Sequence, residues 1–155
     1  DLALRLARAA GAAGMVLGQA HDIAAETAAT PLDVVQITEL QQGKTGALIS
    51  WSAQAGAILA QEDPAPLVQY SAALGLGFQI TDDILDVEGN PEKTGKRLNK
   101  DAKAGKATFV SLLGLNGAKE RAKELISEAC DAVTPLGIKA EPLQHCAKFI
   151  ISRAS

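Results

Sequence analysis

Residues 66–87 form a long, nearly all apolar stretch, and this stretch limits the folds that are open to the chain. Its apolar residues are Leu67, Val68, Leu74, Leu76, Phe78, Ile80, Ile84, Leu85 and Val87. A helix that is apolar on most of its faces is stable only when neighbouring elements cover it. We therefore expect a helix at the centre of a core. Polar residues interrupt the chain before about 18 consecutive apolar residues accumulate, so no transmembrane helix is expected.

The segments on either side also show helical periodicity, with apolar residues recurring at steps of three and four. Besides 66–87, the expected helices cover residues 2–28, 32–61, 107–115, 117–134 and 140–153. Thr30 is the expected N-cap of the second helix, with Pro31 in its first turn. No segment alternates with period two for long enough to indicate a sheet, and aromatic residues are only 3% of the chain. The predicted fold class is all-α, with one core and no internal domain boundary.

Charge and cysteine content exclude some functions. The chain has 15 Lys+Arg against 18 Asp+Glu, a net charge of −3, whereas nucleic-acid-binding proteins are normally basic. Cys130 and Cys146 belong to no CxxC motif, so we expect buried free thiols in a reducing compartment such as the cytoplasm. No signal peptide is recognisable. A helical pattern is already under way at Asp1, so we expect the chain to be part of a longer protein.

A polar stripe on the apolar helix is the strongest indication of chemistry. Gln79, Asp82, Asp83 and Asp86 are spaced i, i+3, i+4 and i+7, which brings them to one helix face. Three carboxylates in a partly buried groove repel one another unless cations are present. Mg²⁺ suits such oxygen ligands. The alternative is a solvent-exposed acidic cluster at the helix end, which the helix dipole would disfavour.

A second candidate is Lys44-Thr45, which glycines flank inside the helix expected over 32–61. A kinked turn there frees a backbone carbonyl beside the Thr45 hydroxyl, and Lys44 supplies a cation for a phosphate. The alternative is an exposed helix lysine near a packing glycine. The segment is not a P-loop, because it lacks the preceding glycine with its spacer and no strand leads into it.

Two weaker candidates follow from charge patterns. Lys96 and Lys106 lie in a polar, locally basic loop over 88–106 and are able to cover a diphosphate placed beside the aspartates, although a solvated loop is the simpler alternative. Gln19 and Asp22 share a face of the first helix with Glu26, and this face lines a cavity or faces water. His21 and His145 have no partner at ligand spacing and are expected at the surface.

Four motifs occur in order, and together they resemble the trans-isoprenyl diphosphate synthases. They are Gly14-Met15…Gly18-Gln19…Asp22, Lys44-Thr45-Gly46-Ala47-Leu48, Gly77-Phe78-Gln79-Ile80-Thr81-Asp82-Asp83-Ile84-Leu85-Asp86, and Gly95-Lys96…Asp101…Gly105-Lys106-Ala107-Thr108. The whole chain is similar to the C-terminal half of these enzymes, above all to bacterial farnesyl/geranyl diphosphate synthases. The resemblance implies the C-terminal helices of the isoprenoid synthase bundle, usually a homodimer. It also implies that isopentenyl diphosphate condenses with dimethylallyl or geranyl diphosphate, which gives geranyl or farnesyl diphosphate and releases pyrophosphate.

The resemblance also implies residue roles. Asp82 matches a Mg²⁺ ligand, and the residues that complete the metal shell are Asp83, Asp86 and Asp101. The residues that match binders of the allylic diphosphate are Lys44, Lys96 and Lys106. The groups that face the cationic carbon are Thr45, Gln79 and the carbonyl of Lys44.

One departure from the family pattern is large. The family's first aspartate-rich motif has no counterpart in residues 1–13. We therefore expect residues 1–155 to be the C-terminal part of a single synthase domain, with half an active site and no activity alone. The alternative is a non-catalytic helical partner that retains the metal-binding half.

Overall fold

The structure, a computed structural model, describes residues 1–88 and 107–152. The regular elements in these ranges are helical throughout, and no strand occurs within them, which confirms the all-α prediction. They are α1 (Leu2–Ala10), α2 (Met15–Ala25), α3 (Val34–Gln41), η1 (Gln42–Gly46), α4 (Ala47–Ala60), α5 (Ala65–Glu88), α8 (Phe109–Val133), η2 (Thr134–Ala140) and α9 (Glu141–Ser152). In this part of the chain, no helix combines the length and apolarity needed to cross a membrane.

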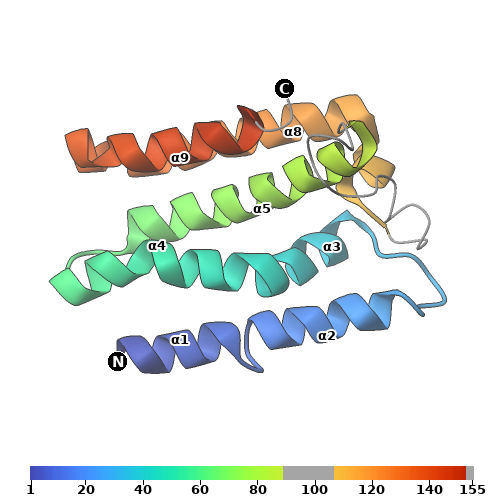
Figure 1. The fold of residues 1–155 in the computed structure, drawn as a ribbon, viewed down its shortest axis with the longest axis horizontal. Helices are drawn as coiled ribbons and strands as arrows, with labels where there is room; N and C mark the ends of the chain where they lie inside the picture. The colour runs from blue at the N-terminus through green and yellow to red at the C-terminus, as the bar shows by residue number, and fades with distance from the viewer. Residues whose placement is uncertain (89–106, 153–155) are drawn as a thin grey trace.

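The helices lie in layers (Figure 1). One layer contains α1 and α2 end to end, and the next contains α3, η1 and α4 as one nearly continuous rod. Helix α5 packs between this rod and α8, and α9 contacts both α5 and α8. The layers bring η1, near residue 44, against both α2 and α5, although these helices are far apart in the sequence.

Helix α5 is the centre of the core, as its apolar composition predicts. Its side chains Ile80 and Ile84 are at most 2% exposed, and they belong to one buried cluster with Leu125 and Ile126 of α8. Gly77 lies at the contact between the two helices, where an added Cβ would come within 3.2 Å of Cδ1 of Ile126. The rigid packing of α5 therefore fixes the position of the polar residues on it.

The helix expected over residues 2–28 is wrong in one respect, since it breaks between α1 and α2. The break lies at Gly11–Gly14, where the chain makes a turn. An added Cβ at Gly14 would lie 2.7 Å from the carbonyl carbon of Ala9, so the turn requires glycine. Each glycine also disfavours an uninterrupted helix by about 1 kcal/mol. After the turn, the packing of α2 on η1 sets the direction of α2.

The N-cap expected at Thr30 is also wrong, because α3 begins at Val34 and its N-cap is Asp33. The Asp33 carboxylate accepts hydrogen bonds from the backbone N–H groups of Val35 and Gln36, both at 2.9 Å. Gln36 in turn accepts from the backbone N–H of Asp33 at 3.0 Å. This reciprocal capping box satisfies three backbone N–H groups, those of Asp33, Val35 and Gln36, and it leaves Pro31 outside the helix.

Towards the C-terminus, the break expected between helices over 107–115 and 117–134 is present as a kink within α8, where the backbone of Gly114 is not helical (φ 71°). The expected separation from the last helix is confirmed, and Gly137 (φ 60°) provides it. Both angles lie in the left-handed region that favours glycine. The prediction that both thiols are buried is wrong for Cys146, whose side chain is exposed. Helix α9 packs Ala147 and Ile150 against the core instead.

Candidate functional site

The site is built around a π turn. Residues Gln42–Gly46 form a π-helical turn between α3 and α4, at the glycine-flanked position where the sequence predicts a kink. In a π turn each hydrogen bond spans five residues rather than four, so the helix widens locally. The turn presents Lys44 and Thr45 to two different neighbours, α2 and α5.

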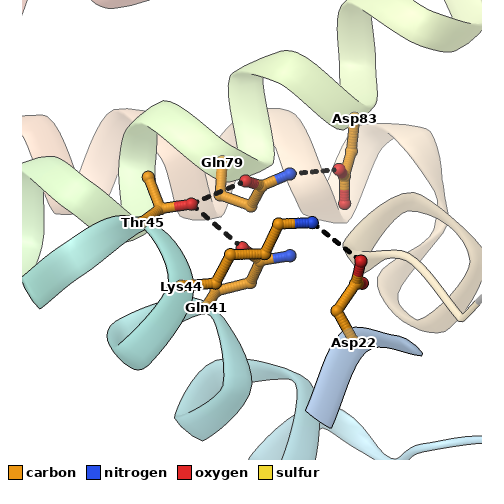
Figure 2. Close-up of polar contacts among 6 residues, drawn as sticks. All are labelled: Asp22, Gln41, Lys44, Thr45, Gln79 and Asp83. Atoms are coloured by element: carbon orange, nitrogen blue, oxygen red, sulfur yellow. Dashed lines mark hydrogen bonds and ion pairs between the residues drawn. The ribbon is translucent and has the colours of Figure 1, made fainter. Parts of the chain in front are cut away.

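Lys44 points towards Asp22 of α2 (Figure 2). Its Nζ lies 2.8 Å from Oδ2 of Asp22, and the two side chains are 33% and 13% exposed. A pair this well shielded from water is screened less than a surface ion pair. The lysine is therefore oriented and not free to sample the solvent, contrary to the alternative of an exposed helix lysine.

Thr45 begins a hydrogen-bonded series that ends at α8 (Figure 2). Its hydroxyl lies 3.2 Å from Oε1 of Gln41 and 3.5 Å from Oε1 of Gln79, and with one proton it donates to one of them at a time. Gln79 donates from Nε2 to Oδ1 of Asp83 at 3.0 Å. The other oxygen of Asp83 accepts from the backbone N–H of Phe109 at 2.9 Å.

The side chains of Asp22, Gln41, Lys44, Gln79 and Asp83 line a cavity of about 160 Å³. Its lining comes from α2, α3, η1, α5 and the residues before α8, and it includes Asp22, Glu26, Gln41, Lys44, Gln79, Asp83 and Thr108. Three of these side chains are carboxylates, and Lys44 is the cation among the described lining residues. Such a cavity is acidic and has hydrogen-bonding groups around it, which suits a ligand that arrives together with cations.

The three aspartates of the stripe do not converge as the sequence predicts. Asp83 is 5% exposed and faces the cavity, whereas Asp82 and Asp86 are half-buried and do not line it. Within residues 1–88 and 107–152, no three Asp, Glu, His or Cys side chains come together in a way that holds a metal ion. The physical reason is that adjacent helix positions diverge by about 100°, so Asp82 and Asp83 leave α5 in different directions.

Two further expectations concern the polar face of α2 and the loop expected over residues 88–106. Asp22 lines the cavity, but Gln19 is exposed and does not, because it lies about 100° around α2 from Gly18, the residue that faces η1. The exposed positions of His21 and His145 agree with the sequence prediction. Three other predicted residues lie outside the described residues, namely Lys96, Asp101 and Lys106.

Sequence reasoning overlooked one side chain of the site, Gln41. It lies one helical turn before Thr45 and its side chain meets the Thr45 hydroxyl. The i, i+4 spacing of a glutamine and a threonine next to the glycine pair was the available signal.

Comparison with known proteins identifies the family and the fold of the chain. The family model of polyprenyl synthetases matches residues 5–136, which is most of the chain. The chain belongs to the polyprenyl synthetase family. Its fold is that of the isoprenoid synthases: a farnesyl/geranylfarnesyl (FPP/GFPP) synthase from Zymomonas mobilis superposes with a TM-score of 0.83 at 41% identity, over 96% of this chain and 49% of that one.

Other members of the polyprenyl synthetase family match to a similar extent. The farnesyl diphosphate synthase of Bacillus subtilis is 40% identical over 151 residues, which are 96% of this chain and 50% of that enzyme. A geranyltransferase from Helicobacter pylori, solved with magnesium and isoprenyl diphosphate, has a TM-score of 0.79 at 34% identity, over 97% of this chain and 50% of that one. The chain thus spans about half the length of these relatives.

Proposed function

We propose that this chain provides the part of a prenyltransferase that ionises an allylic diphosphate. The overall reaction would join isopentenyl diphosphate to dimethylallyl or geranyl diphosphate, with geranyl or farnesyl diphosphate and pyrophosphate as products. The observation that supports this most strongly is the meeting of Lys44, Thr45 and Gln79, from two separate segments, beside one acidic cavity. Relatives named as farnesyl diphosphate synthases at about 40% identity support the same reaction.

The chemistry that these residues suit begins with charge separation. When the allylic C–O bond breaks, its electron pair leaves with pyrophosphate and a carbocation remains. The Lys44 ammonium is suited to stabilise the negative charge on the leaving oxygens. The Thr45 hydroxyl oxygen and the Gln79 amide oxygen are dipoles suited to the cationic carbon, and their positions are held by the hydrogen bonds to each other and to Asp83.

Divalent metal is the expected cofactor, and the residues present fit it in part. Asp82 and Asp86 are half-buried carboxylates one turn apart on α5, and Mg²⁺ usually takes one or two carboxylates and retains several waters. We assign these two residues to hold it, whereas both oxygens of Asp83 already accept hydrogen bonds within the fold. When bound, magnesium would neutralise charge on the diphosphate. The Helicobacter pylori geranyltransferase, which was solved with both magnesium and isoprenyl diphosphate, supports this pairing of metal and ligand.

We extend the proposal to a cytoplasmic homodimer. Support for self-association comes from large apolar side chains that α1 and α2 leave exposed, namely Leu4, Val16, Leu17 and Ile23 at 44–58%. Sedimentation of the chain over a range of concentrations tests it, and a monomer at all concentrations would contradict it.

Calorimetric titration with inorganic pyrophosphate tests the assignment directly on this chain. We expect binding that requires Mg²⁺ and that weakens about tenfold in Lys44→Gln, since one charge-assisted contact is worth about 1.5 kcal/mol. Asp82→Asn is expected to weaken the Mg²⁺-dependent binding, because it removes one of the two carboxylates assigned to the metal. Lys139→Gln, which removes an exposed lysine of η2, is the matched control and should bind as the wild type does. Absence of binding to the wild type, or equal binding by Lys44→Gln, would contradict the proposal.

A further inference from the structure

Two residues of α2 contact the two ends of Lys44, and their joint role goes beyond the binding of a diphosphate. We propose that Gly18 and Asp22 are positioning residues that hold the Lys44 side chain extended towards the cavity. Gly18 does so by allowing backbone contact at the base of the lysine, and Asp22 by binding its ammonium.

The first contact is between backbones. Gly18 is buried, and an added Cβ there would overlap the backbone N of Lys44 and lie 2.6 Å from its Cα. From the other side, an added Cβ at Gly43 would lie 3.3 Å from the Cα of Gly18. Helix α2 and the π turn therefore touch with no side chain between them, and no residue other than glycine fits at position 18.

The second contact is at the end of the side chain. Nζ of Lys44 is 2.8 Å from Oδ2 of Asp22, and the Asp22 side chain is only 13% exposed. Gly18 and Asp22 are i and i+4 on one face of α2, separated along its axis by about 6 Å. That separation is close to the reach of an extended lysine side chain, so Lys44 can span from its backbone contact with Gly18 to Asp22, towards which its ammonium points (Figure 2).

Holding both ends matters because a lysine side chain is flexible. Its four-carbon stem adopts many rotamers in solution, and ordering it costs free energy. The backbone contact at Gly18 and the ion pair with Asp22 order the side chain within the fold itself. For catalysis the consequence rests on the proposed function: a diphosphate entering the cavity would meet an ammonium group that is already aimed at it.

Reactivity of the Lys44 amine measures this arrangement without any enzymatic assay. An amine held in a short ion pair must first lose its partner and its proton before it attacks an acylating reagent. We propose trace labelling of the folded chain with acetic anhydride, with mass spectrometry of the Lys44 peptide and the exposed Lys139 as internal reference. The variants are Asp22→Asn, Gly18→Ala and the control Gly56→Ala, where an added Cβ meets nothing within 4 Å.

We expect the relative labelling of Lys44 to rise about threefold or more in Asp22→Asn, in line with the loss of one partly exposed ion pair. Gly18→Ala should raise it as well, and Gly56→Ala should leave it unchanged. Unaltered labelling in Asp22→Asn, or an equal rise in Gly18→Ala and Gly56→Ala, would overturn the proposal. If circular dichroism shows that Gly18→Ala does not fold, the nearly isosteric Asp22→Asn decides alone.

A second arm separates this inference from the proposed function. Wild-type chain is labelled with and without magnesium pyrophosphate, and protection of Lys44 is expected if it binds the diphosphate. Absence of protection, combined with the expected response of the variants, would leave the positioning of Lys44 intact and refute its role towards diphosphate. If magnesium pyrophosphate protects Lys44 but the variants label as the wild type does, the role towards diphosphate is supported and the positioning of Lys44 by Gly18 and Asp22 is refuted.

Discussion

At the scale of single residues, Asp83 shows how one carboxylate serves the fold. It is 5% exposed, and its two oxygens accept from Gln79 of α5 and from the backbone N–H of Phe109, which begins α8. The Phe109 N–H belongs to the first turn of a helix, where N–H groups have no partner within the helix. A buried carboxylate at that position satisfies it and also benefits from the positive end of the helix dipole.

The change in the free energy of unfolding on replacing Asp83 distinguishes this structural role from a role as a metal ligand. Asp83→Asn is expected to destabilise the metal-free chain by about 1.5–3 kcal/mol, because it removes a charged acceptor from two hydrogen bonds. The matched change Asp86→Asn, on the same helix, should alter the free energy of unfolding much less. Urea denaturation in the presence of a chelator measures both. If Asp83 were chiefly a repelled metal ligand, Asp83→Asn would stabilise the metal-free chain, and that result would refute the structural role.

Tyr70 links α5 to α9, and the pKa of its phenol is raised. Its hydroxyl donates to the carbonyl of Leu143 at 2.9 Å, and the residue is 2% exposed. Burial raises the pKa of Tyr70 well above its usual value, and the nearby thiol of Cys146 raises the pKa further. The folded state thus keeps the phenol proton at pH values where the unfolded state loses it.

The stability contributed by Tyr70 is therefore complete below the unfolded-state pKa of about 10 and is lost as the pH rises above it. Between pH 8 and pH 11 we expect the wild type to lose about 1.4 kcal/mol more than Tyr70→Phe. At pH 8 the variant itself should cost about 1 kcal/mol, from the lost hydrogen bond. Denaturation curves of both proteins at the two pH values provide the comparison, and parallel pH dependence would contradict the assignment.

At the scale of elements, the start of α3 determines where the rod that carries Lys44 begins. The capping box of Asp33 and Gln36 satisfies N–H groups of the first turn. Asp33→Ala is expected to lower the free energy of unfolding by about 1 kcal/mol, whereas Thr30→Ala, three residues earlier, should have almost no effect. Thermal unfolding of the two variants tests this. A larger loss in Thr30→Ala would mean that the helix begins earlier than the structure has it.

At the scale of the whole molecule, the chain carries one of the two aspartate-rich motifs that its resemblance implies, and it spans about half the length of its relatives. We predict that the 155 residues bind magnesium pyrophosphate but form no prenyl product from isopentenyl diphosphate with dimethylallyl or geranyl diphosphate. The reason is that charge on the diphosphate would be neutralised from one side only. Mass spectrometry of extracted products measures this, and product formed in proportion to chain concentration would show that the prediction is wrong.

The sequence by itself determined the helical class and the central position of α5, and it singled out Lys44, Thr45 and Gln79 as candidate site residues. These follow from periodicity, from apolar composition and from motifs, which are local properties of the chain. The predictions from sequence were wrong where two local structures have similar free energies. Asp33 rather than Thr30 caps α3, and a turn rather than a continuous helix forms at Gly11–Gly14.

Only the tertiary structure decided which polar groups meet. Asp22 reaches Lys44 because α2 packs on η1 through Gly18, and Asp83 reaches Phe109 because α5 packs against the start of α8. These pairs are 22 and 26 residues apart, and their contact depends on how helices cross and not on spacing along one helix. The separation of Asp82 from Asp83 has a different cause: adjacent positions on one helix diverge by about 100°, so Asp83 lines the cavity and Asp82 does not.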